Sequence, residues 1–308
     1  MVLHVETPLI RSIPMEKASG RQVFLKMDAL QPAGSFKLRG IGRLCEEKAK
    51  EGVNRFISSS GGNAGYAAAW AAKELDLSIL VVVPETTSQE AINAIRSLGG
   101  EVRVHGANWN QANELVLSLL KEDPKSAYVH PYDNPIMWKG HGTIIDEAFK
   151  QGSKPDAIVL SVGGGGLLSG VVEGLNRNGW SDVPVVACET EGTASFAGTF
   201  KAGRIVKLKG INSVATSLGA TSVTPHVLEI LKTNKIRSFV GSDKWAVSAC
   251  RKFLDDHRVL VEPACGTALS AVYENSPVLE DAGKVMVVVC GGIGISFDKL
   301  SELEKKFL

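Results

Sequence analysis

One lysine stands in a setting that could support covalent chemistry. The stretch from Gln31 to Gly40 reads Gln-Pro-Ala-Gly-Ser-Phe-Lys-Leu-Arg-Gly, so Lys37 follows a Pro/Gly turn and an aromatic residue, Phe36. Ser35 can cap a helix that begins here. In the first turn of a helix the positive end of the dipole lowers the pKa of a lysine, which can then form a Schiff base with a carbonyl compound. A solvated lysine at the start of a surface helix would explain the same pattern.

Three glycine-containing loops each follow a predicted strand. They are Ser59–Gly65, Gly163–Gly166 and Cys290–Gly294. In open α/β sheets, ligands bind at the carboxyl ends of the strands. The three loops therefore predict one shared site.

The loop Gly163–Gly166 predicts an anion-binding site. Four glycines between a strand and a helix allow backbone N–H groups to approach an anion, and the helix dipole favours the negative charge. The loop is neither a lysine-bearing P-loop nor a clean GxGxxG motif. A phosphate monoester fits better than a dinucleotide, because no acidic ribose ligand follows at the expected distance of about 20 residues. A tight strand-to-helix turn and a dinucleotide-binding loop stay open as alternatives.

The other two loops carry polar groups. Serine hydroxyls, backbone amides and Asn63 at a helix start suit a carboxylate and a hydroxyl acceptor, although a plain helix cap has the same composition. Cys290 ends the last predicted strand, either as an inert buried thiol or as a neutral hydrogen-bond partner of a ligand.

Strands and helices alternate along most of the chain. The predicted strands are 23–27, 55–58, 79–83, 101–104, 128–130, 157–162, 183–188 and 285–289. The predicted helices are 37–51, 66–75, 88–98, 108–121, 140–150, 166–175, 242–257 and 263–273, and 212–224 is predicted to be a long loop. This alternation is typical of parallel α/β units, so we expect the α/β class.

Composition excludes several kinds of partner. The 308 residues suit one large domain or two smaller ones, and the formal charge is +1 from 34 basic and 33 acidic residues. No strong field favours nucleic acid or an anionic membrane, and no apolar run approaches the roughly 18–20 residues that span a bilayer. The first eleven residues do not resemble a signal peptide. Five widely spaced cysteines indicate neither a disulfide framework nor a zinc site. We therefore expect a cytoplasmic protein.

A lysine, an anion-binding loop, a carboxylate-binding loop and a strand-end thiol together describe a pyridoxal-phosphate site. The sequence resembles the fold-type II pyridoxal-phosphate enzymes, in particular the serine/threonine dehydratase family and its short animal-type L-serine dehydratases. The resemblance covers nearly the whole chain. It is carried by 34–40 (GSFKLRG), 59–65 (SSGGNAG), 163–168 (GGGGLL), 213–219, 262–266 (EPACG) and 290–292 (CGG).

The resemblance implies a tryptophan synthase β-like fold with two open, twisted, mostly parallel sheets flanked by helices. Residues 1–39 and 132–308 would form a large cofactor-binding domain, and residues 40–131 a small domain. A homodimer is the family's usual assembly.

The resemblance also implies a role for each site residue. Lys37 would bind the cofactor aldehyde as a Schiff base, with Phe36 on one ring face and the Ser217 region on the other. Asn63 would bind the ring hydroxyl oxygen, and Cys290 would face the pyridine nitrogen. The phosphate would be bound by Gly163, Gly164, Gly165, Gly166 and Leu167. The substrate carboxylate would be bound by Ser60, Gly61, Asn63 and Ala64.

A monovalent cation such as K⁺ is a further implication. In this family Glu189 and carbonyl groups near it are placed to hold the cation. The carbonyl donors would come from Gly163, Thr193, Leu218 and Ala220. A strand-end carboxylate bonded to local amides is the alternative explanation of Glu189.

The activity implied is that of a lyase in amino-acid catabolism. It would convert L-serine to pyruvate and ammonia, and L-threonine to 2-oxobutanoate and ammonia. Serine racemase has an acid/base serine at the position of Gly61, so racemisation should be weak here. One alternative is a β-replacement enzyme of cysteine synthase type, although Ser59–Gly65 does not match the Thr-Ser-Gly-Asn-Thr-Gly loop of that type. The others are a non-catalytic ligand-binding relative and a nicotinamide-dependent oxidoreductase.

Overall fold

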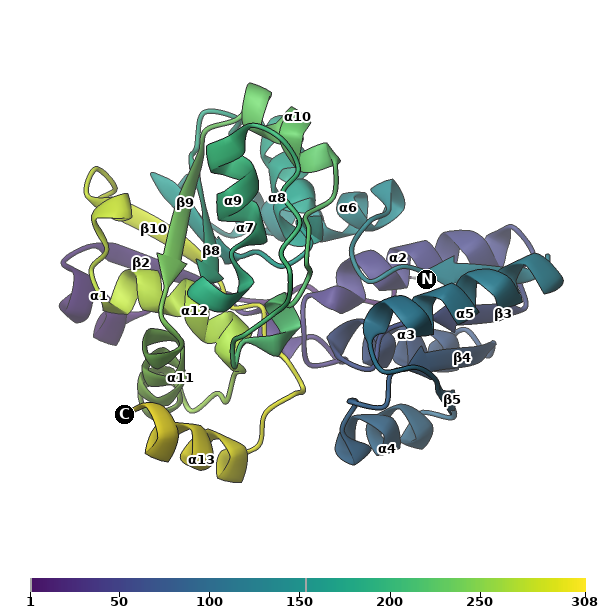
Figure 1. Cartoon of the computed structure of the whole chain (residues 1–308). Helices are drawn as coiled ribbons and strands as arrows, with labels where there is room; N and C mark the ends of the chain where they lie inside the picture. Colours follow the sequence, from purple (N-terminus) through teal and green to yellow (C-terminus); the bar gives the residue numbers. More distant parts are fainter. Residues whose placement is uncertain (1, 153) are drawn as a thin grey trace.

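Two sheets organise the chain in this computed structural model, which describes residues 2–152 and 154–308 (Figure 1). Residues 1 and 153, both in the expected large domain, lie outside the described residues. The six-stranded sheet has the order β1-β2-β10-β7-β8-β9, and the four-stranded sheet has the order β5-β4-β3-β6. All neighbouring strands are parallel except the β1/β2 pair. The expected α/β class with two mostly parallel sheets is confirmed.

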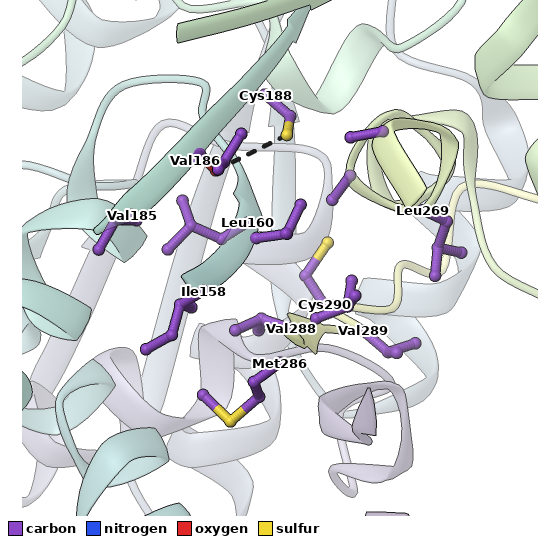
Figure 2. Close-up of a cluster of buried hydrophobic side chains, with 14 of the residues drawn as sticks. Ile158, Leu160, Val185, Val186, Cys188, Leu269, Met286, Val288, Val289 and Cys290 are labelled. Carbon is purple, nitrogen blue, oxygen red and sulfur yellow. Dashed lines mark hydrogen bonds between the residues drawn. The ribbon is translucent and has the colours of Figure 1, made fainter. Parts of the chain in front are cut away.

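The central strands of the larger sheet are buried on both faces, as the strands of parallel sheets usually are. Its strands are β1 (Leu9–Arg11), β2 (Gln22–Lys26), β7 (Ala157–Ser161), β8 (Val185–Thr190), β9 (Ile236–Gly241) and β10 (Lys284–Val288). Every residue of β7 and β8 is buried. Figure 2 shows Ile158 and Leu160 of β7 in one apolar cluster with Val185 and Met286. This core fixes the ends of β7 and β10, which lead into two of the three predicted loops, Gly163–Gly166 and Cys290–Gly294.

Helices cover the smaller sheet on both faces. Its strands are β3 (Arg55–Ser58), β4 (Ser78–Val83), β5 (Glu101–Val104) and β6 (Ser126–Val129). Val81 and Val83 of β4 share a core with the buried alanines of α3 (Asn63–Glu74), whereas Leu80 and Val82 share one with α5 (Trp109–Glu122). This alternation follows from side chains pointing to opposite faces of a strand.

The remaining helices surround these two sheets. They are α1 (Ile13–Ser19), α2 (Lys37–Lys50), α4 (Gln89–Ser97), α6 (Pro135–His141), α7 (Thr143–Gln151), α8 (Gly166–Arg177), α9 (Ser195–Ala202), α10 (His226–Thr233), α11 (Asp243–His257), α12 (Pro263–Tyr273) and α13 (Phe297–Phe307). The predicted helix 140–150 is wrong in its start, because α6 ends at His141 and α7 begins after Gly142. Among the described residues, no helix has the length and apolarity needed to cross a membrane.

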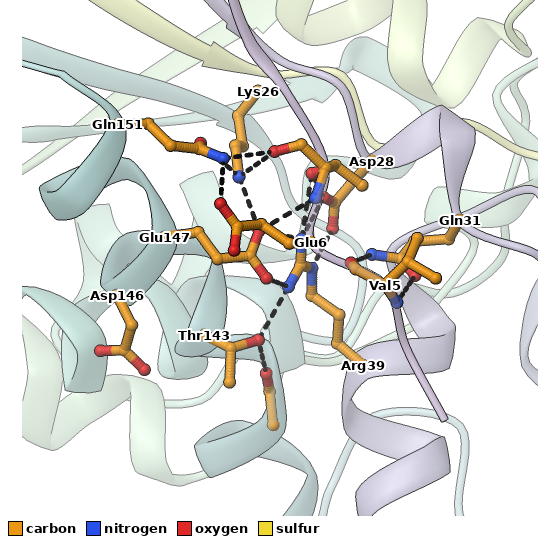
Figure 3. Close-up of polar contacts among 12 residues, drawn as sticks. Val5, Glu6, Lys26, Asp28, Gln31, Arg39, Thr143, Asp146, Glu147 and Gln151 are labelled. Carbon is orange, nitrogen blue, oxygen red and sulfur yellow. Dashed lines mark hydrogen bonds and ion pairs between the residues drawn. The ribbon is translucent and has the colours of Figure 1, made fainter. Parts of the chain in front are cut away.

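A buried cluster of charges ties the start of α2 to the larger sheet (Figure 3). The Arg39 guanidinium binds the Asp28 carboxylate through Nε at 2.7 Å, and the Glu147 carboxylate through Nη1 at 2.5 Å and Nη2 at 2.7 Å. Lys26 of β2 adds a contact between Nζ and Oε2 of Glu147 at 2.6 Å. The charges of the two cations, Arg39 and Lys26, balance those of the two anions, Asp28 and Glu147. The cluster therefore fixes Arg39 without leaving a buried net charge.

We expect Arg39→Ala to lower the free energy of unfolding by about 3–5 kcal/mol, because it leaves the Asp28 and Glu147 carboxylates buried without their main partner. Arg43→Ala is the matched control on the same helix, since it removes only the partly exposed pair with Glu47 and should cost less than about 1 kcal/mol. Urea denaturation of both variants measures the difference. Equal losses would show that the buried cluster does not hold α2 in place.

Candidate active site

The backbone before Lys37 is attached to the end of the larger sheet. Ser35 pairs with Gly291 in an isolated bridge, and the Phe36 amide donates to the Cys290 carbonyl oxygen at 3.1 Å. Helix α2 begins at Lys37, so the predicted first-turn position is confirmed. The expected cap by Ser35 is wrong: Phe36 occupies the N-cap position, and the buried Ser35 hydroxyl has no hydrogen-bond partner among the described residues.

Lys37 has the environment of a nucleophile. Its Nζ donates to the Pro131 carbonyl oxygen at 2.5 Å and lies 5.1 Å from the centre of the Phe36 ring. Within residues 2–152 and 154–308, no carboxylate forms an ion pair with it. Burial lowers the pKa of Lys37 to about 8, although Cys290 and Glu262 raise it. A substantial share of the amine is therefore unprotonated slightly above neutral pH.

The glycine loop 163–166 presents free backbone donors. Helix α8 begins at Gly166, and its N-cap Gly165 has φ +88°. No side chain of the described residues caps this helix. Among the described residues, the amides of Gly163, Gly164 and Gly165 donate no hydrogen bond. A Cβ atom at Gly164 would lie 2.3 Å from the Tyr132 ring, so a larger residue would not fit. The loop forms an uncapped helix N-terminus of the kind that binds phosphate.

A second uncapped N-terminus lies at α3. The N-cap is Gly62, and no side chain within residues 2–152 and 154–308 caps the helix. Its start at Asn63 is three residues earlier than predicted. The amides of Gly61, Asn63 and Ala64 donate no hydrogen bond in the part of the chain that the structure describes. A Cβ atom at Gly61 would lie 2.6 Å from Cγ2 of Thr87, so Thr87 fills the space beside this loop. The free amides suit a carboxylate group.

Asn63 connects this second N-terminus to the larger sheet. Its Nδ2 donates to Oε1 of Glu262 at 2.7 Å and to Oγ of Ser217 at 3.3 Å. Its Oδ1 accepts a hydrogen bond from the Ile293 amide at 2.9 Å. The expected site residues Asn63 and Ser217 therefore lie together, beside the loop that follows Cys290.

Contacts between the segments close a ring around one site. Pro131 accepts from Lys37, and the next residue, Tyr132, packs on Gly164. A Cβ atom at Gly163 would lie 3.1 Å from Cα of Leu218, the neighbour of Ser217. Together with the Asn63 bonds and the Phe36–Cys290 bond, these contacts bring the three loops and Lys37 together, as their places at strand ends predict.

Three residues of the site were not predicted from the sequence, namely Thr87, Pro131 and Tyr132. A fourth, Glu262, lies in the motif 262–266 but was given no role there. Of these residues, Glu262 has the clearest signal in the sequence, because it is an acidic residue directly before the proline that begins a predicted helix. It is buried, and burial raises the pKa of its carboxyl group.

Cys290 is a neutral group in this site. A hydrogen bond with Cys265 and burial raise the pKa of the Cys290 thiol well above its usual value. Cys290 lies two residues after the end of β10, and only 6% of it is exposed (Figure 2). The thiol can share a hydrogen bond with a ligand heteroatom, and it cannot act as a carboxylate-like counter-ion.

Glu189 lies at the end of β8 and caps α9. Its carboxylate accepts from the amides of Phe196 and Ala197, both at 2.7 Å. Burial raises the pKa of Glu189 to about 7, although these amides lower it. The described residues contain no cluster of three or more His, Cys, Asp or Glu side chains suited to a metal ion. The cation site expected at Glu189 stays a prediction.

Comparison with known proteins shows a matching family model and several similar proteins. The family model described as "Pyridoxal-phosphate dependent enzyme" matches residues 2–291. A mouse "L-serine dehydratase/L-threonine deaminase" is 46% identical, over 98% of this chain and 95% of the mouse protein. A mouse "Serine dehydratase-like" protein is 44% identical, over 98% and 94%. The structure of a fungal L-serine ammonia-lyase from Rhizomucor miehei superimposes with a TM-score of 0.95 at 36% identity, covering 100% of both chains.

The lowered pKa of Lys37 has a consequence for stability that can be measured without any ligand. The pKa is about 8 in the native protein and 10.5 in the unfolded chain, so between these values the unfolded state binds more protons. Between pH 8 and pH 10.5, the titration of Lys37 therefore makes the free energy of unfolding rise with pH. Below pH 8, Lys37 is charged in both states, and the native protein bears the full cost of burying the ammonium group. Lys37→Met should therefore stabilise the cofactor-free protein at pH 7, and the gain should shrink towards pH 10.5.

Urea denaturation between pH 7 and pH 10 measures this gain. Lys50→Met is the matched control, because Lys50 is exposed at the other end of α2 and should give no pH-dependent difference. A stability difference for Lys37→Met that does not change with pH would contradict the lowered pKa.

Proposed function

Because the chain belongs to the pyridoxal-phosphate dependent enzyme family, we propose that it is an L-serine dehydratase that also deaminates L-threonine. L-Serine loses its α-proton and its β-hydroxyl group, and hydrolysis of the resulting enamine gives pyruvate and ammonia. One observation carries the proposal: the Lys37 amine, with a pKa lowered to about 8, shares a ring of contacts with two uncapped helix N-termini.

The residues present fit pyridoxal phosphate. The free amides of Gly163–Gly166 and Leu167 at the start of α8 would hold the phosphate, and Lys37 would bind the aldehyde. Phe36 lies beside the Lys37 amine, where its ring can pack on the cofactor. The neutral Cys290 thiol would face the pyridine nitrogen. When bound, the cofactor supplies an electron sink for the negative charge left on the substrate carbon.

The chain's own groups bind the substrate and move protons. The hydroxyl of Ser60 and the amides of Gly61, Asn63 and Ala64 hold the substrate carboxylate at the start of α3. Lys37 then takes the proton from Cα, a general-base step favoured by a pKa near the working pH. Gly61 has no side chain that could return a proton to the opposite face, so racemisation is weak.

Both L-serine and L-threonine fit this chemistry. They differ by one methyl group, and an apolar contact distinguishes such a difference by only about 1–3 kcal/mol. The proposed products are pyruvate from L-serine and 2-oxobutanoate from L-threonine.

The proposal extends to organisation and location. Residues 1–39 and 132–308 form the cofactor domain and residues 40–131 the small domain; the separation of the strands into two sheets supports this division. The family resemblance supports a cytoplasmic homodimer.

The purified protein, supplied with pyridoxal phosphate, should release pyruvate from L-serine and 2-oxobutanoate from L-threonine. Lys37→Ala should slow this release by at least about 10³-fold, because it removes the general base as well as the cofactor's covalent partner. A lactate dehydrogenase-coupled assay follows pyruvate, and Arg43→Ala, outside the site, should keep its activity. Cofactor absorbance without 2-oxoacid would instead indicate a β-replacement enzyme or a non-catalytic relative.

A monovalent cation at Glu189 is the second part of the proposal. The pKa of Glu189 is raised to about 7 from 4.5, so the stability that its protonated form contributes is complete below pH 4.5 and is lost as the pH rises through 7. K⁺ would offset this loss by binding the ionised carboxylate. KCl should therefore raise the melting temperature at pH 8 and not at pH 4.5, relative to tetramethylammonium chloride. An equal increase in Glu189→Gln would contradict the site.

A further inference from the structure

A buried carboxylate in the site has no part in the proposed proton transfers. Glu262 directly precedes α12 and is 4% exposed. Its Oε1 accepts from Nδ2 of Asn63 at 2.7 Å, and its Oε2 accepts from the Gly294 amide at 3.3 Å. No lysine or arginine within residues 2–152 and 154–308 forms an ion pair with it. A buried carboxylate needs such hydrogen bonds to offset its lost hydration.

The backbone makes room for this carboxylate. A Cβ atom at Gly292 would lie 2.0 Å from Cδ of Glu262, and Gly292 has φ +133°, a conformation that favours glycine. The loop after Cys290 therefore closes over Glu262 only because position 292 has no side chain. Glu262 is held between this loop and Asn63.

These contacts determine which way the Asn63 amide points. The backbone N–H of Ile293 can only donate a hydrogen bond, so the Asn63 atom that faces it is Oδ1, and the NH₂ group faces Glu262. The Oδ1 on the other side of the amide accepts from the Ile293 amide. One N–H of Nδ2 is thus bound to Glu262. The second N–H faces Oγ of Ser217 at the longer distance of 3.3 Å, so it is available to a stronger acceptor.

We propose that Glu262 is a positioning residue that directs the second N–H of Asn63 to the ring hydroxyl oxygen of bound pyridoxal phosphate. The proposal rests on the proposed function, because it needs the cofactor at Lys37. A fixed donor at that oxygen stabilises its ionised form, and a donor next to a carboxylate is better held than one next to a neutral group. Glu262 therefore controls which ionisation form the bound cofactor adopts.

The location of the hydrogen bond between Asn63 and Glu262 has a second consequence. Asn63 opens a helix on the smaller sheet, whereas Glu262 and Gly294 belong to segments next to the larger sheet. The bond between Asn63 and Glu262 therefore joins the two sheets at the cofactor ring. Cofactor binding and the approach of the two sheets depend on the same carboxylate.

The test compares Glu262→Gln, Asn63→Ala and the double variant, each as the cofactor-loaded protein. Absorbance spectra report the ratio of the ionised to the un-ionised ring hydroxyl, and equilibrium dialysis gives the dissociation constant of pyridoxal phosphate. We expect Glu262→Gln to shift the ratio towards the un-ionised form and to weaken cofactor binding by roughly tenfold, the size of one charge-assisted hydrogen bond. The double variant should match Asn63→Ala, because Glu262 acts through Asn63.

Glu274→Gln is the matched control, since Glu274 lies at the other end of α12 and, among the described residues, forms an ion pair only with Lys252 at the surface. It should leave the spectrum and the cofactor affinity unchanged. A Glu262→Gln protein with the wild-type spectrum and affinity, or with effects that add to those of Asn63→Ala, overturns the inference even if its melting temperature falls. A wild-type protein that binds no pyridoxal phosphate or releases no pyruvate overturns the proposed function itself.

Discussion

The guanidinium group of Arg39 holds the segment that carries Lys37 in place. Besides the Asp28 and Glu147 carboxylates, its nitrogens bind the hydroxyl groups of Thr7 and Thr143 at 3.0 and 2.9 Å (Figure 3). These partners come from the N-terminal segment, from the stretch after β2 and from α7, and Arg39 is only two residues after Lys37. Burying four charges is costly, and their mutual pairing offsets much of that cost. The position of the Lys37 backbone thus depends on a cluster that takes no part in the proposed chemistry.

Burial lowers the pKa of the Lys37 amine, and the charge cluster does not offset this effect with an ion pair. The acids of the cluster are occupied by Arg39 and Lys26, so none of them forms an ion pair with the Lys37 amine. The two uncapped N-termini of α3 and α8 contribute positive potential, which favours two anions in one site. Such a site suits an amino acid bound through its carboxylate next to a phosphate-bearing cofactor.

Local sequence patterns predict the parts of this site that depend on backbone shape. The lysine after a Pro/Gly turn and the four glycines before a helix are local signals, and both lie where the sequence predicts. Glu262 could not be placed, because its partner Asn63 is 199 residues away. The strand β9 escaped prediction because its residues are mostly half-exposed and include Arg237 and Ser238. The cap by Ser35 was wrong because a distant pairing with Gly291 uses the backbone there.

Long-range packing also bears on the outcome of the reaction. The absence of a side chain at Gly61 follows from its surroundings, since Cγ2 of Thr87 and Cγ1 of Val83 would lie 2.6 and 3.1 Å from a Cβ atom there. Val83 is the last residue of β4, and Thr87 lies in the loop that follows. An acid/base side chain at position 61 would therefore require this loop to move. Because β4 pairs with β3, whose end leads into Gly61, the strand pairing itself leaves little room for an acid/base side chain at position 61, in agreement with the weak racemisation that we propose.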